Sequence, residues 1–104
     1  METPVKTIAQ NTLHICSAAE ALALLRKHGG HGNAAFMRSL ADAVSDENNR
    51  ITGTVGDFNN LIDRFEVLGD YFDALRVCDF ALKIYPRSAT LLAITLNTCA
   101  RSGA

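Results

Sequence analysis

The fold of this chain is decided by residues 68–75, which read LGDYFDAL. Gly69 suits the left-handed conformation in which many helices end, because glycine has no Cβ to clash with the neighbouring carbonyl. Asp70 suits the N-cap of a second helix, and Asp73 follows three residues later, where a capping box places an acid. The stretch therefore predicts two helices joined by a very short turn.

Apolar residues recur at helical spacing on both sides of this turn. The first helix is predicted to begin with Asp57 as its N-cap, and the second must end before Pro86, which cannot continue a helix. Helices joined by so short a turn pack antiparallel. The first apolar face consists of Phe58, Leu61, Ile62, Phe65 and Leu68, and the second of Tyr71, Ala74, Leu75, Cys78, Ala81, Leu82 and Tyr85.

A further helix is predicted from Ser88 to Gly103 at the C-terminal side of this hairpin. Its buried side is expected to hold Leu91, Leu92, Leu96 and Cys99, with Ile94 widening the apolar stripe. The residues from Ser88 to Ala100 include no charged side chain, and the run is too short to span a bilayer.

The N-terminal half predicts a second, less regular hairpin. Ser17 and Glu20 form a capping box before Ala21, Leu22, Leu24 and Leu25. The glycine-rich loop 28–33 ends that helix, and Asn33 is expected to cap the next one. The face of that next helix consists of Phe36, Met37, Leu40, Ala41 and Val44.

Two segments outside these hairpins are less regular. Residues 45–54 are polar and predict a loop. Thr3 and Pro4 favour a short helix over residues 3–14, although Thr12 to Cys16 also suits a strand.

The central hairpin carries a spaced pattern of small residues that recurs along the chain. Gly69, Ala74, Ala81 and Pro86 stand at the spacing G-x4-A-x6-A-x4-P. Gly29, Ala34 and Ala41 repeat its first three positions 40 residues earlier, and Gly103 lies 34 residues after Gly69. Alanines seven residues apart on one helical face let two helices approach closely. We therefore expect consecutive hairpins to stack, unless the chain is an irregular helical bundle in which this spacing arises by chance.

This pattern resembles the tetratricopeptide repeat, with residues 55–88 as the best-matching unit. The resemblance implies one all-α domain over residues 1–104, in which antiparallel helical hairpins stack into a right-handed superhelix of about five to six helices. Residues 15–48 would form a degenerate hairpin, and about six extra residues would loop out before the next unit. Residues 89–104 would be the first helix of a further repeat or a capping helix. Ile62 departs from the family, which prefers a small residue there, and Cys78 replaces its usual aromatic.

Composition excludes several classes of protein. The chain has 104 residues, 48% hydrophobic and 20% charged, which suits one globular domain. Its formal net charge of -1 offers no basic footprint for nucleic acid or for an anionic membrane surface. Three irregularly spaced cysteines do not form a secreted disulfide framework, and no apolar signal core precedes them. The expected location is the cytoplasm.

Motifs that would support catalysis or metal binding are weak. His28 and His31 bracket two glycines, but a metal site needs three or four ligands, so an exposed loop is the preferred interpretation and a small hydrolase the rival one. The paired acids, such as Asp70 and Asp73, are interpreted as caps and solvated faces. Cys78 and Cys99 are expected to lie close together, where they are interpreted as small core residues, with a disulfide formed under oxidation as the rival interpretation. We predict no enzyme activity, no cofactor and no metal.

The resemblance implies that first helices line a groove that binds an extended segment or helix of another protein. The groove residues are then Asn59, Asp63, Glu66, Thr90, Asn97 and Arg101, with Ala93 beside them, and their mix is slightly acidic. The predicted function is a protein–protein interaction module. The alternative is a small secretion-type chaperone that holds an export client.

The last predicted helix has no helical partner. Leu91, Ile94 or Leu96 would then expose apolar area, which usually finds a partner surface. We predict self-association through residues 88–101, or a natural chain that continues beyond Ala104.

Overall fold

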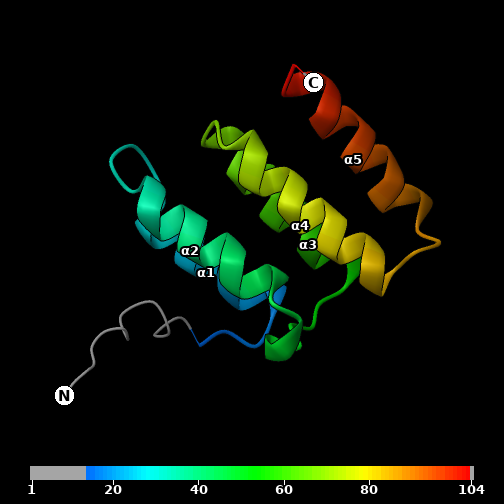
Figure 1. The fold of residues 1–104 in the computed structure, drawn as a ribbon, viewed down its shortest axis with the longest axis horizontal. Coiled ribbons are helices and arrows are strands. Elements are labelled where there is room, and N and C mark those ends of the chain that lie inside the picture. Colours follow the sequence, from blue (N-terminus) through cyan, green and yellow to red (C-terminus); the bar gives the residue numbers. More distant parts are fainter. Residues whose placement is uncertain (1–13, 104) are drawn as a thin grey trace.

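The computed structural model describes residues 14–103, which form five α-helices and one short 3-10 helix. Figure 1 shows two helical hairpins followed by a single helix, arranged side by side. The predicted all-α fold of packed helix pairs is confirmed for these residues, whereas the suggested helix at 3–14 lies almost wholly outside them. The elements are α1 (Ala18–His28), α2 (Ala34–Ser45), η3 (Glu47–Asn49), α3 (Val55–Val67), α4 (Tyr71–Ile84) and α5 (Ala89–Arg101).

The turn between α3 and α4 has the geometry that its sequence predicts. Gly69 adopts a φ of 81°, its N–H donates to the Glu66 carbonyl at 2.8 Å, and the Asp70 N–H donates to the Phe65 carbonyl at 2.9 Å. These two bonds form a Schellman motif, which satisfies carbonyls at the end of α3. The Asp70 carboxylate accepts the Asp73 N–H at 3.2 Å, so α4 begins where its N-cap predicts.

One predicted helix start is wrong, and one correctly placed N-cap residue makes no cap bond. The cap of α3 is Thr54 rather than Asp57, which serves instead as the acid of a reciprocal capping box. Val55 and Gly56, the residues between them, favour helices weakly, so the sequence pattern placed the N-cap three residues too late. Asn33 lies at the N-cap of α2, but its amide group donates to the His28 carbonyl and makes no cap bond.

The core lies between α1, α3 and the inner faces of α2 and α4. Phe58, Leu61 and Phe65 of α3 are fully buried at its centre. Ala74 and Ala81 have no exposed surface, as predicted, and α4 packs closely on both α3 and α5. Each hairpin thus buries one face within itself and another against its neighbour.

The buried positions of the two hairpins match, but at two different offsets. Ala18, Ala21, Leu22 and Leu25 of α1 precede the buried Phe58, Leu61, Ile62 and Phe65 of α3 by 40 residues. Met37, Leu40, Ala41 and Val44 of α2 precede Ala74, Val77, Cys78 and Ala81 of α4 by only 37. The predicted equivalence of Ala34 with Ala74 is therefore wrong. Ala34 is exposed, and Met37 and Val44 take the places of the two alanines.

The segment between the hairpins, residues 46–53, is more structured than the predicted loop. It contains η3 and then an extended stretch in which Thr52 pairs with Ser17 in a parallel bridge. Ile51 within it is buried. We refer to residues 46–53 as the insert.

Helix α5 packs on α4 with a face that matches the predicted one only in part. Leu91 and Thr98 are fully buried, whereas Leu92 and Leu96, predicted to be inside, are 53% and 65% exposed. The stretch is apolar around most of its circumference, so periodicity alone did not identify the packed face. The prediction that Leu91 is an exposed contact for self-association is wrong.

Candidate functional site

Five of the six predicted groove residues line one cleft between α3 and α5. The cleft has a volume of about 150 Å³. Residues from two neighbouring turns of each helix form its walls, whereas the predicted residue Thr90 is exposed one turn away from it. We call it the polar cleft, and its lining consists of Asn59, Ile62, Asp63, Glu66, Ile94, Asn97, Thr98 and Arg101.

Helical spacing explains why these side chains meet. Asn59, Asp63 and Glu66 follow one another at intervals of four and three residues, so they share one face of α3. Asn97 and Arg101 are four residues apart on α5. The two polar faces oppose each other because α5 contacts α3 as well as α4.

At one end of the polar cleft, a buried carboxylate is paired with a basic side chain. The Glu66 side chain is only 8% exposed, and it accepts a hydrogen bond from Arg101 Nη1 at 3.0 Å and another from the Thr98 hydroxyl. Glu66 and Arg101 therefore satisfy each other and hold α5 against α3. The acidic bias expected for the groove is reduced, because this acid is paired with a base.

The remaining polar groups of the cleft are two amides and one acid. Asp63 is exposed and makes no salt bridge to residues within 14–103. Asn59 and Asn97 each offer an acceptor and two donors. A carboxamide can therefore bond both the N–H and the C=O of an extended peptide. This chemistry suits recognition of a polypeptide backbone.

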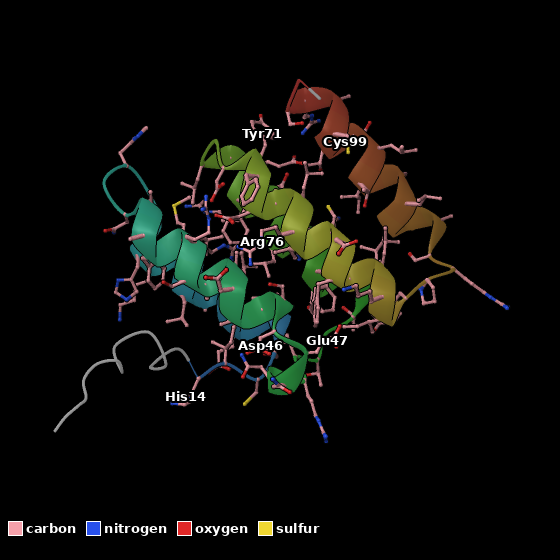
Figure 2. All side chains as sticks on the ribbon, in the orientation of Figure 1. His14, Asp46, Glu47, Tyr71, Arg76 and Cys99 are labelled. Carbon is pink, nitrogen blue, oxygen red and sulfur yellow. The ribbon has the colours of Figure 1, made fainter. Side chains whose placement is uncertain are left out.

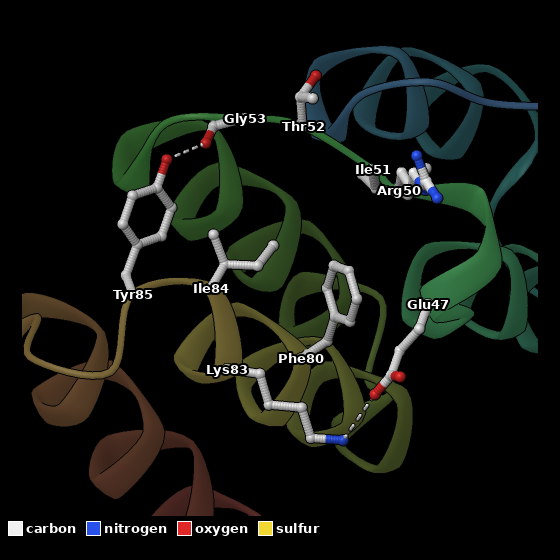
Figure 3. Close-up of a pocket in the computed structure, with 9 residues that line it drawn as sticks. All are labelled: Glu47, Arg50, Ile51, Thr52, Gly53, Phe80, Lys83, Ile84 and Tyr85. Carbon is white, nitrogen blue, oxygen red and sulfur yellow. Dashed lines mark hydrogen bonds and ion pairs between the residues drawn. The ribbon is translucent and has the colours of Figure 1, made fainter.

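A larger pocket lies where the insert passes the end of α4. Its volume is about 520 Å³, and most of its lining is apolar (Figure 3). We call it the insert pocket. Its lining consists of Glu47, Arg50, Ile51, Thr52, Gly53, Phe80, Lys83, Ile84 and Tyr85.

The walls of the insert pocket come from both of its parent segments. Figure 3 shows Phe80, Ile84 and Tyr85 projecting from the end of α4 toward the insert. The Tyr85 hydroxyl donates to the Gly53 carbonyl, and Lys83 Nζ lies 3.7 Å from Glu47 Oε2. These two contacts fix the insert over α4 and leave the space between them open.

Sequence reasoning missed this pocket because it treated residues 45–54 as a loop. Two signals were available. Ile51 is a large apolar residue among polar ones, which indicates an anchored segment rather than a solvated loop. Tyr85, directly before Pro86, needs a hydrogen-bond partner for its hydroxyl when its ring is packed.

The residues considered for other chemistry are not assembled into a site. The His28 ring packs edge-on against Phe36, with ring centroids 5.5 Å apart, and His31 is exposed in a separate loop cavity. Within the part of the chain that the structure describes, no three His, Cys, Asp or Glu side chains are grouped to hold a metal ion. Cys78 is buried and Cys99 half-buried, both as free thiols, and burial raises the pKa of the Cys78 thiol.

No helix within residues 14–103 has the length and apolar character needed to cross a membrane. Comparison with known proteins finds no family model, no curated protein and no solved structure that matches this chain. The tetratricopeptide resemblance therefore rests on residue spacing.

Proposed function

We propose that this chain is a tetratricopeptide-like protein–protein interaction module that binds an extended segment of a partner in the polar cleft. The observation that carries the proposal is the placement of Asn59, Asp63 and Asn97 around one concave site with their polar ends uncommitted within the described residues. An extended backbone needs donors and acceptors along its length, and the two amides offer both.

The paired charges of the cleft support a neutral or weakly basic ligand. Glu66 and Arg101 are occupied with each other, so Asp63 is the ionised group left to select the partner. A segment with a Lys or Arg next to its bound backbone complements Asp63. Binding to a carboxylate-terminated tail is disfavoured, because Arg101, the one basic side chain among the described residues of the cleft, is already paired.

The proposal includes a cytoplasmic location. It is supported by the three cysteines, all of which are free thiols in the structure.

The test is a pull-down from the native lysate with wild type and an Asn59→Ala, Asp63→Ala, Asn97→Ala variant. Arg101 is left unchanged so that the Glu66 pair still holds α5. The matched control is Asn60→Ala, an exposed α3 residue outside the cleft. Loss of one bound protein from the cleft variant, and its retention by the control, is expected. Equal recovery by all three proteins would reject the cleft as the binding site.

The exposed apolar face of α5 favours a second candidate, a chaperone of export clients. Leu92 and Leu96 lie four residues apart on that face and are more than half exposed. Such a face suits an unfolded client or a second copy of this chain. A chaperone would suppress aggregation of an unfolded client and bind its folded form weakly. The interaction module would bind its partner as well in the folded form as in the unfolded form.

A further inference from the structure

We propose that the insert pocket is a second docking site, at which the edge of residues 51–53 pairs with an extended segment of a partner protein. The segment would place a large apolar side chain in the pocket and a carboxylate beside Arg50. The site shares no residue with the polar cleft, so this inference is independent of the function proposed above.

The first argument is the direction of the backbone groups in the insert. The Thr52 N–H donates to the Cys16 carbonyl at 3.0 Å, and the Ala18 N–H donates to the Thr52 carbonyl at 2.8 Å. In an extended chain, successive residues direct their polar groups to opposite edges. The backbone N–H and C=O groups of Ile51 and Gly53 therefore point away from residues 16–18. The Gly53 carbonyl confirms this direction, because it accepts from the Tyr85 hydroxyl at the pocket.

The second argument is that this edge is incompletely paired. Within residues 14–103, the Ile51 carbonyl and the Gly53 N–H have no hydrogen-bond partner. They flank Thr52 on the side away from residues 16–18, and they match the groups through which one residue of an added strand exchanges two bonds. The bridge between Ser17 and Thr52 already holds the edge extended, so a ligand does not have to order it.

The third argument is the apolar space beside that edge. A pocket of about 520 Å³ is within the size range of ligand sites in proteins. Ile84 is 40% exposed there, although it is a large apolar residue. A Leu, Ile or Phe side chain projecting from a paired strand would cover Ile84 and contact Phe80 and Tyr85.

The fourth argument is charge. Arg50 is exposed on the rim and forms no salt bridge with any residue in 14–103, whereas Lys83 is shared between Glu47 and Asp79 at 3.7 and 3.9 Å. Arg50 is also the one non-glycine residue with positive φ among the described residues, at 49°. This conformation ends η3 and sets Arg50 directly before the open edge. The free cation selects an acidic residue next to the apolar one.

The probe is a displayed library of random octapeptides, selected on wild type and counter-selected on Ile84→Asp. Ile84 is partly exposed, so this substitution adds a charge to the pocket without opening the core. Val67→Asp, at an exposed apolar position on α3, is the matched control. Selected peptides are expected to share a large apolar residue beside an acid and to bind wild type and Val67→Asp equally.

Binding of a selected peptide is then measured by fluorescence anisotropy. Arg50→Asn, which suits the left-handed backbone, should weaken it about tenfold, as expected for loss of one charge-assisted contact. The Asn59→Ala, Asn97→Ala variant should bind as wild type does. Hydrogen exchange at the Gly53 amide should slow when peptide is bound, and N-methylation of the peptide backbone at its apolar residue should abolish binding.

Several outcomes would overturn the proposal. The selection would overturn it if no peptide is enriched on wild type relative to Ile84→Asp, or if the selected peptides share no acidic residue. The binding measurement would overturn it if the N-methylated peptide binds as tightly as the unmodified one. A peptide that binds the polar-cleft variant weakly but binds Ile84→Asp as tightly as wild type would also count against the insert pocket. That result would support the function proposed for the cleft.

Discussion

Arg38 of α2 donates through Nε to both carboxylate oxygens of Asp73 on α4, at 3.0 and 3.1 Å. The Asp73 side chain is 1% exposed, and Arg76 Nη1 also donates to its carboxylate at 3.2 Å. Arg76 also reaches Asp42, so four charged side chains join the second helices of the two hairpins. Figure 2 shows Arg76 between α2 and α4. This network corrects the interpretation of Asp73 as a solvated cap residue.

Substitution of Asp73 tests how much this network stabilises the stack. Asp73→Asn keeps the size of the side chain but leaves two arginines without their shared anion. We expect the free energy of unfolding to fall by about 1–3 kcal/mol. Asp79→Asn, on the exposed side of the same helix, should change it by less than about 0.5 kcal/mol. Urea denaturation of both variants measures the difference, and equal stabilities would show that the network contributes nothing.

Asp70 predicts a pH dependence of stability. Burial, followed by the interaction with the Asp73 side chain, raises the pKa of Asp70 to about 6, although the Asp73 backbone N–H and Arg38 act in the opposite direction. The folded protein therefore holds this proton more tightly than the unfolded chain does, and stability from this group is lost as the pH rises from about 4 to 6. Asp70→Asn keeps the cap and removes the ionisation.

The Asp70→Asn variant should match wild type below pH 4 and exceed its unfolding free energy by up to about 1 kcal/mol above pH 6, a figure reduced for solvent screening of this half-buried group. Thermal unfolding from pH 3.5 to 7.5 checks the difference. A carboxyl carbon titration of Asp70 by NMR checks the group itself. A midpoint near 4 would contradict the assignment.

Ala81 tests the close packing of the hairpins. Its side chain has no exposed surface, so Ala81→Leu must displace neighbours on α3 or α5. We expect a loss of about 1–3 kcal/mol in unfolding free energy. Ala93→Leu on the exposed face of α5 is the control and should be nearly neutral. If both variants have the same unfolding free energy as wild type, a small side chain at position 81 is not required.

The outer face of α5 predicts self-association. Leu92→Ser with Leu96→Ser should lower the weight-average mass at high concentration, as measured by sedimentation equilibrium. Val67→Ser with Phe72→Ser replaces two equally exposed apolar residues elsewhere and should leave the mass unchanged. A wild type that stays monomeric at millimolar concentration would remove this face as an interface. Leu91→Ser, in contrast, should destabilise the fold, because Leu91 is buried.

Local chemistry allowed most of the fold to be predicted. Gly69, Asp70 and Ser88 set helix boundaries through bonds to residues within five positions, so the sequence contains what is needed to place them. The polar cleft was partly predictable for the same reason, because residues three or four apart share a helix face.

The contacts that could not be predicted join distant parts of the chain. Asp73 looks like a cap residue until Arg38, 35 positions away, is placed beside it. The packed face of α5 depends on which side α4 offers, and its uncharged apolar sequence does not decide this. The insert pocket depends on Tyr85 reaching Gly53, which no periodic pattern encodes.

The two offsets between the hairpins locate spare length in the chain. Going from the buried Leu25 to the buried Met37 takes three residues more than going from Phe65 to Ala74, although both paths connect equivalent layers. Gly30 and Gly32 lie in that longer connection, with open space where a Cβ would be. Shortening or lengthening the chain there changes no buried position, so this connection is where a tag, a cleavage site or a grafted loop would be tolerated best.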